Sequence, residues 1–151
     1  MDPHCACSHT GYVNIPFCCP VLWCSRLQTE IALSTIETEY VALSTSCKDL
    51  VPLVAVIREL SAAVGLNASF NSNIHCKVHE DNVGALTLAC LEPHRMTPHS
   101  KHYVIKYHWF REKVADLSQH ITLIKIDTKN QLSGLFTKGL PLAYFVHYDV
   151  Y

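Results

Sequence analysis

The sequence predicts an α/β domain with a mixed sheet flanked by helices, and three observations lead to this prediction. Strand-forming residues, some alternating with polar ones, recur at 10–33, 74–81 and 121–126. Apolar residues instead recur at helical spacing in 36–64 and 100–115. The resulting order is β-β-β-α-β-α-α-β-α, and this interleaving is typical of α/β domains.

Residues 10–33 predict two or three short antiparallel strands, of which the last two cover Val21–Cys24 and Ile31–Leu33. Pro16 and Pro20 restrict these strands to edges or breaks because proline donates no ladder hydrogen bond.

The first long helix is expected to begin after Ser34, whose hydroxyl is a good N-cap. Its apolar stripe comprises Ile36, Tyr40, Leu43, Cys47 and Leu50. Pro52 predicts a kink or a restart, and Gly65 predicts the stop. Farther along, the sequence predicts a half-buried strand ending at Glu80-Asp81, helices over 82–90 and 100–115, a strand over 121–126 and a short helix over 131–140.

Composition fits one folded domain of 151 residues, with 49% apolar and 17% charged residues and a net charge of −1. This balance excludes a domain that is strongly basic throughout. Basic residues nevertheless cluster between His94 and Lys113, either as a solvated helix face or as a phosphate-contacting stripe. The first residues predict neither a signal peptide nor a membrane span, so we expect reduced cysteines and an intracellular location.

Two acidic positions are candidates for metal binding or catalysis. Asp81 follows a predicted strand, and ligands of open α/β sheets bind beyond the carboxyl ends of strands. The alternative for Asp81 is a helix N-cap. Glu39 lies at the border of the buried helix face, whereas Glu37 points more toward solvent. For both glutamates the alternative is an acid that stabilises the first turn of the helix.

The cysteines and histidines near the amino terminus form another cluster, but their spacing does not predict zinc. Structural zinc sites use pairs separated by two to four residues, whereas Cys5 and Cys7 are separated by one and Cys18 and Cys19 are adjacent.

Four blocks, at 34–43, 79–82, 100–112 and 129–140, follow one another in a fixed order. The first reads Ser-Thr-Ile-Glu-Thr-Glu-Tyr-Val-Ala-Leu and the second His-Glu-Asp-Asn. Together they resemble the ribonuclease H domain of copia-type LTR retrotransposon polyproteins over roughly residues 8–141. The boundaries expected from this resemblance are an irregular segment at 1–9, a ribonuclease H-like domain at 10–141 and an unmatched tail at 142–151.

The resemblance implies a ribonuclease H-like mixed sheet and Mg²⁺-dependent hydrolysis of the RNA strand in RNA–DNA hybrids. Two Mg²⁺ ions held by four carboxylates would clamp the attacking and leaving oxygens. Carried over by position, Glu39 and Asp81 are the second and third carboxylates, so they are the implied catalytic and metal-binding residues. The implied contacts to phosphates of the nucleic acid are Lys101, His102, His108 and Arg111.

Two departures from the family pattern predict an inactive copy. The family's first carboxylate lies on a central strand that would precede Thr10-Gly11-Tyr12, and we expect the sequence to begin too late to contain it. The position of the fourth carboxylate, three residues after Gln131, is Gly134. Loss of the central strand is expected to leave two strand edges unpaired or to force them together. The alternatives to a degenerate enzyme are a non-catalytic module that binds nucleic acid or protein, or the product of a pseudogene. The resemblance also implies the rest of a retroelement polyprotein as a partner, and a cytoplasmic location, because retroelement particles assemble in the cytoplasm.

Overall fold

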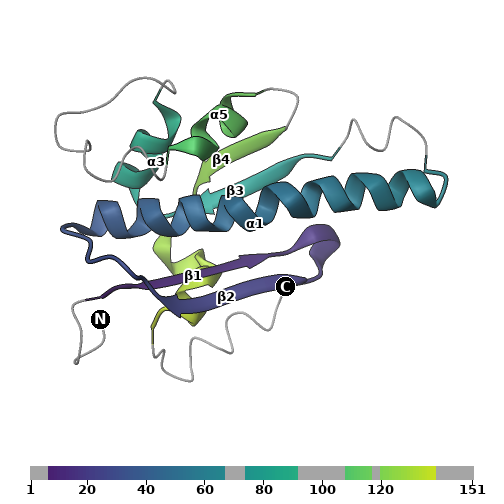
Figure 1. The fold of residues 1–151 in the computed structure, drawn as a ribbon. Coiled ribbons are helices and arrows are strands. Elements are labelled where there is room, and N and C mark those ends of the chain that lie inside the picture. The colour runs from purple at the N-terminus through teal and green to yellow at the C-terminus, as the bar shows by residue number, and fades with distance from the viewer. Residues whose placement is uncertain (1–6, 67–73, 92–107, 117–119, 139–151) are drawn as a thin grey trace.

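The computed structural model describes residues 7–66, 74–91, 108–116 and 120–138, and its order of strands and helices confirms the α/β class. Its elements, drawn in Figure 1, are β1 (His9–Asn14), η1 (Pro16–Cys18), β2 (Leu22–Leu27), α1 (Thr35–Ala63), β3 (Cys76–Glu80), α3 (Val83–Cys90), α5 (Trp109–Ala115), β4 (Ile121–Lys125), η3 (Thr128–Asn130) and η4 (Leu132–Phe136).

The strands of the described residues form two sheets of two strands each, so the prediction of one mixed sheet is wrong for this part of the chain. Strands β1 and β2 pair antiparallel, with His9 opposite Leu27. Strands β3 and β4 pair parallel, with Cys76 opposite Ile121. Helix α1 runs along both sheets (Figure 1). Two of the two or three antiparallel strands predicted for residues 10–33 are thus confirmed, and Ile31–Leu33 forms no strand.

Helix α1 begins and ends where the sequence predicts. The Ser34 hydroxyl accepts a hydrogen bond from the Glu37 N–H at 3.1 Å, and Gly65 follows the helix with a φ of 76°. The helix continues through Pro52 and does not restart there. It is long and apolar enough to pass a length-and-composition test for a membrane span, a test that core helices of soluble proteins also pass.

The core lies where α1, α3 and α5 meet over the β3–β4 pair. Small residues of α3 let it approach α1 closely, and an aromatic ring from α5 closes the contact. The buried residues of this cluster are Tyr40, Val41, Leu43, Cys47, Ala85, Ala89 and Phe110.

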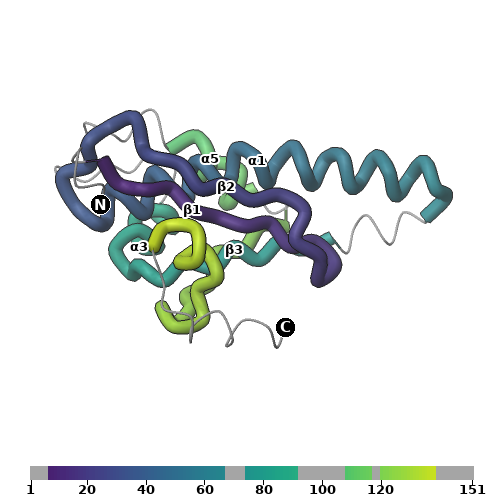
Figure 2. The backbone as a smooth tube through the Cα atoms, turned by 90° about the horizontal axis from the view of Figure 1, so that it is seen from below, coloured from purple at the N-terminus to yellow at the C-terminus, as the bar shows by residue number. Residues whose placement is uncertain are grey.

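The carboxyl-terminal part of the described chain packs on β1. The predicted helix at 131–140 is a short 3₁₀ helix, η4, and it lies across β1 (Figure 2). A Cβ added to Gly11 of β1 would lie 2.5 Å from the Thr137 Cγ2 and 2.9 Å from the Phe136 Cβ. Glycine at this position therefore permits the close approach. Of the predicted helix at 100–115, the part from His108 onward lies within the described residues, and it is helical from Trp109.

Two glycine-to-alanine substitutions should have opposite effects on stability. Gly11→Ala should lower the free energy of unfolding by about 1–3 kcal/mol, because the added methyl group overlaps η4. Gly134→Ala should raise it by about 0.4–1 kcal/mol, because a Cβ at Gly134 meets nothing within 4 Å and the unfolded chain loses freedom. Urea unfolding of the two variants beside the parent chain measures both changes. Equal effects of the two substitutions would contradict the described packing.

Candidate functional site

Glu39 and Asp81, which are distant in sequence, come within electrostatic range of each other. Glu39 lies in the second turn of α1, and Asp81 directly follows β3. Burial is the main cause that raises the pKa of Glu39, and the negative charge of Asp81 raises it further. Lys138 acts in the opposite direction. The fold thus places both predicted carboxylates at the same end of β3.

Glu80 is a third acid at this place, and the sequence reasoning did not assign it a role. Its side chain is only 5% exposed, and its Oε1 accepts a hydrogen bond from the Asn82 N–H at 2.9 Å. Burial raises the pKa of Glu80 to about 7, with further contributions from the charges of Glu39 and Asp81. Strand periodicity could have found it, because Glu80 shares a strand face with Cys76 and Val78.

The structure shows which residues take the alternative role of stabilising the start of a helix. Asn82, and not Asp81, caps α3, since the Asn82 Oδ1 accepts from the Ala85 N–H at 3.0 Å. Glu37 serves the start of α1, where its Oε2 accepts from the Leu33 N–H at 2.8 Å. Asp81 is half-buried, and its backbone oxygen accepts from the Lys125 Nζ at 2.7 Å.

The acidic residues do not make a complete metal centre. Within the described ranges, no group of three or more His, Cys, Asp or Glu side chains could hold a metal ion. One oxygen of Glu80, its Oε1, already accepts the Asn82 N–H. The residues present therefore do not fit a site for two Mg²⁺ ions, which needs several ionised oxygen ligands.

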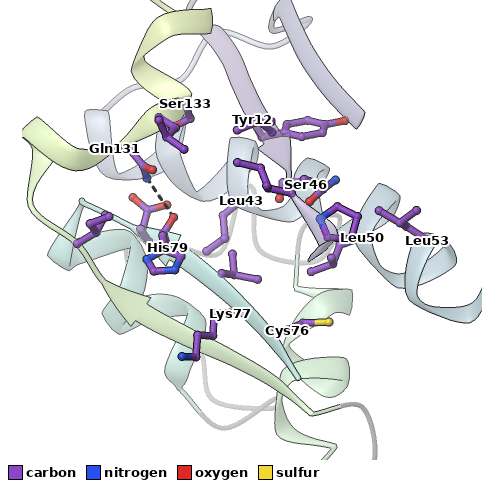
Figure 3. A pocket seen from close by; sticks show the side chains of 18 of the residues that line it. Tyr12, Leu43, Ser46, Leu50, Leu53, Cys76, Lys77, His79, Gln131 and Ser133 are labelled. Carbon is purple, nitrogen blue, oxygen red and sulfur yellow. Dashed lines mark hydrogen bonds between the residues drawn. The ribbon is translucent and has the colours of Figure 1, made fainter. Parts of the chain in front are cut away.

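Gly134 lies in η4, three residues after Gln131, and Gln131 contacts β3. The Gln131 Nε2 donates a hydrogen bond of 3.0 Å to the His79 backbone oxygen, which ties this segment to the end of β3 (Figure 3). Position 134 then supplies no side chain that could bind a cation or orient a water molecule. The segment that the resemblance associates with the fourth carboxylate is thus held beside β3, but it lacks the functional group.

A cavity of about 820 Å³ opens between β1, α1 and β3 (Figure 3). Its wall along α1 is apolar, and Glu39 and Glu80 lie at one end with Gln131. The apolar residues that α1 contributes are Ala42, Leu43, Leu50, Leu53, Val54 and Ile57. The acidic cluster is therefore one end of a larger, mostly apolar space.

Two of the residues expected to contact phosphates are buried. Arg111 is 1% exposed, and its Nε donates to the Leu91 backbone oxygen at 3.1 Å. His108 is 9% exposed, and its Nδ1 makes a short hydrogen bond with the Tyr40 hydroxyl. Burial, followed by the charge of Arg111, lowers the pKa of His108 to about 4.

His108 and Arg111 are thus buried in this structure, and the contacts to phosphates that the resemblance implies for them stay a prediction. The amino-terminal part of α5 faces the core. Phe110, which lies between His108 and Arg111 in the sequence, is fully buried there. Both side chains stabilise the packing of α5 in this structure. Lys101 and His102 lie outside the described residues.

The described part of the molecule is thus an α/β domain with an acidic cluster and a split sheet. The chain is 31% identical over 134 residues to the retrovirus-related Pol polyprotein from transposon TNT 1-94 of Nicotiana tabacum, a match that covers 89% of this chain. It is 29% identical to the corresponding polyproteins from transposons RE2 and RE1 of Arabidopsis thaliana, over 94% and 93% of this chain. No protein-family model and no solved structure matches the chain.

These similarities confirm the resemblance to copia-type retrotransposon polyproteins, and the chain is a domain derived from such a retroelement. It spans 9% of the length of each of the three relatives.

Proposed function

We propose that the chain is the ribonuclease H-like segment of a copia-type Pol polyprotein and that this copy does not hydrolyse RNA. The observation that carries the proposal is the meeting of Glu39 and Asp81 at one end of β3 without a carboxylate at Gly134. The positions of the two acids agree with the second and third carboxylates that the sequence resemblance implies. The absence of a functional side chain at position 134 supports the proposed loss of activity.

The chemistry of phosphodiester hydrolysis explains why two carboxylates are too few. Two divalent ions carry four positive charges, and they must be held at fixed positions to stabilise the attacking and leaving oxygens. Glu80 is a poor replacement for a missing ligand, because its Oε1 already accepts a hydrogen bond from the Asn82 N–H. A single Mg²⁺ held weakly by Glu39 and Asp81, together with phosphates of a hybrid, is the most that this cluster would bind.

A cleavage assay on a labelled RNA–DNA hybrid tests the proposal. The parent chain, Asp81→Asn and Glu59→Gln are incubated with Mg²⁺, and Glu59 is a matched control because it is an exposed acid near the far end of α1. We expect all three proteins to leave the RNA strand intact at equal, background levels. Cleavage by the parent chain and by Glu59→Gln, but not by Asp81→Asn, would show an active nuclease and refute the proposal.

A further inference from the structure

Two histidines meet where the parallel strands β3 and β4 begin. The strands run side by side in the same direction (Figure 1), and their first residues, Cys76 and Ile121, are partners. His75 and His120 each directly precede one of these partners. Their ring centroids are 4.8 Å apart, and the ring planes are inclined by 64°. The fold therefore brings together two imidazole groups that are far apart in the sequence.

The spacing of the two rings suits a single cation bound by both. Imidazole nitrogens bind Zn²⁺ at about 2.0–2.1 Å, so two rings on one ion have centroids roughly 4.5–5.2 Å apart at bond angles of about 90–110°. The observed distance of 4.8 Å lies within this range. His75 is exposed, so rotation of its side chain can aim a nitrogen at an ion beside His120 without moving the strands.

The backbone of His120 holds its ring in place. Its φ is 52°, which is uncommon for a residue other than glycine. The backbone oxygen of His120 accepts a hydrogen bond from the Cys76 N–H at 2.9 Å, and this bond ties the residue to the start of β3. Such conformations persist where the surrounding structure holds them, and they are concentrated at sites that bind ligands. The start of β4 is therefore ordered before any ion binds.

The ligand type decides which cations the pair would take. Imidazole nitrogen suits Zn²⁺, Cu²⁺ and Ni²⁺, whereas Mg²⁺ prefers oxygen ligands. Side chains alternate along β3, so Lys77 lies on the same face as His75, and it is exposed. Its positive charge lowers the affinity for a cation, but salt screens this repulsion at the surface.

The histidine pair is separate from the acidic cluster. His75 directly precedes β3, whereas Glu80 and Asp81 lie at the opposite end of this strand. At about 3.3 Å per residue, the two places are roughly 17–20 Å apart. An ion bound by the histidines therefore does not reach the carboxylates, and the two sites differ in ligand chemistry.

We propose that His75 and His120 together bind one divalent transition-metal ion of the kind that prefers imidazole. Water fills the remaining coordination positions of this ion. Because the ion connects the starts of β3 and β4, it binds the folded chain better than the unfolded one and stabilises the strand pair. The inference does not depend on the proposed loss of hydrolysis.

A titration of the full chain with Ni²⁺, followed by NMR of the histidine rings, tests the proposal. Ni²⁺ is paramagnetic and broadens the ring signals of the histidines that bind it, so the Kd is read from His75 and His120 themselves. His120→Asn removes one ligand and keeps a residue type that tolerates a positive φ. His79→Asn is the matched control, because His79 is an exposed histidine of β3 whose partner in β4 is Ile124.

We expect both rings to broaden together in the parent chain and in His79→Asn. The remaining ring in His75→Asn or His120→Asn should bind Ni²⁺ with a Kd at least about tenfold higher, since removal of even an indirect support of a metal site costs this much. Mg²⁺ at the same concentration should leave both ring signals unchanged.

The other outcomes overturn the proposal. Ring signals that stay sharp in the parent chain would reduce the pair to an edge-to-face packing contact. An unchanged Kd at the remaining ring in both single variants would mean that each histidine binds the ion alone. An equal increase of the Kd in His79→Asn would indicate a general effect of exposed histidines. The exposed His75→Asn variant decides the test if His120→Asn does not fold.

Discussion

Arg111→Ala should lower the free energy of unfolding by about 3 kcal/mol. The Arg111 side chain is buried, so its truncation leaves a cavity in the core next to Phe110. It also leaves the Leu91 carbonyl without the donor that it has in the parent chain. Urea unfolding at neutral pH, followed by circular dichroism, measures the change.

Lys113→Ala is the matched control for this prediction, because Lys113 is an exposed basic residue on the same helix. Its effect on stability should be within about 0.5 kcal/mol. The pair separates a structural role from contact with phosphates. If Arg111→Ala leaves stability unchanged and weakens binding to an RNA–DNA hybrid, Arg111 belongs to a nucleic-acid surface and the described burial is wrong.

Glu80→Gln should stabilise the protein at pH 8 by an amount on the order of 3 kcal/mol, provided that the unfolded chain has an ordinary carboxyl pKa. At this pH the folded protein must bury the charge of Glu80 beside Glu39 and Asp81. Glutamine removes the charge but keeps an oxygen that can accept the Asn82 N–H. Thermal and urea unfolding in the presence of EDTA measure the gain without bound cations.

The sign of the pH dependence follows from the direction of the pKa shift. The pKa of Glu80 rises from an ordinary 4.5 to about 7 on folding, so the folded protein holds a proton that the unfolded chain has released between these values. This contribution to stability is complete below pH 4.5 and is lost as the pH rises through 7. The advantage of Glu80→Gln should therefore vanish below about pH 4.

Glu59→Gln, at an exposed position of α1, should change stability by no more than about 0.5 kcal/mol at either pH. An equal gain in both variants would indicate a general effect of net charge. A loss of stability in Glu80→Gln at pH 8 would mean that the buried carboxylate is compensated by a partner such as Lys125.

Local sequence signals predicted several boundaries well. Ser34 and Gly65 mark the ends of α1 because capping and a positive φ depend on the residue itself. The alternation before Asp81 predicted β3, and the same alternation places Glu80 on the inner face. Of the two effects predicted for Pro52, a restart of the helix is wrong, since α1 continues through this residue.

By itself the sequence determined the α/β order, the start and end of the long helix, the relationship to retrotransposon polyproteins and the absence of a carboxylate at Gly134. Only the tertiary structure decided that the sheet is split, that Glu80 joins Glu39 and Asp81, and that Arg111 and His108 are buried. The physical reason is that caps and periodicity act over a few residues along the chain. Strand pairing, burial and the interaction of charges depend instead on which distant segments come together in space.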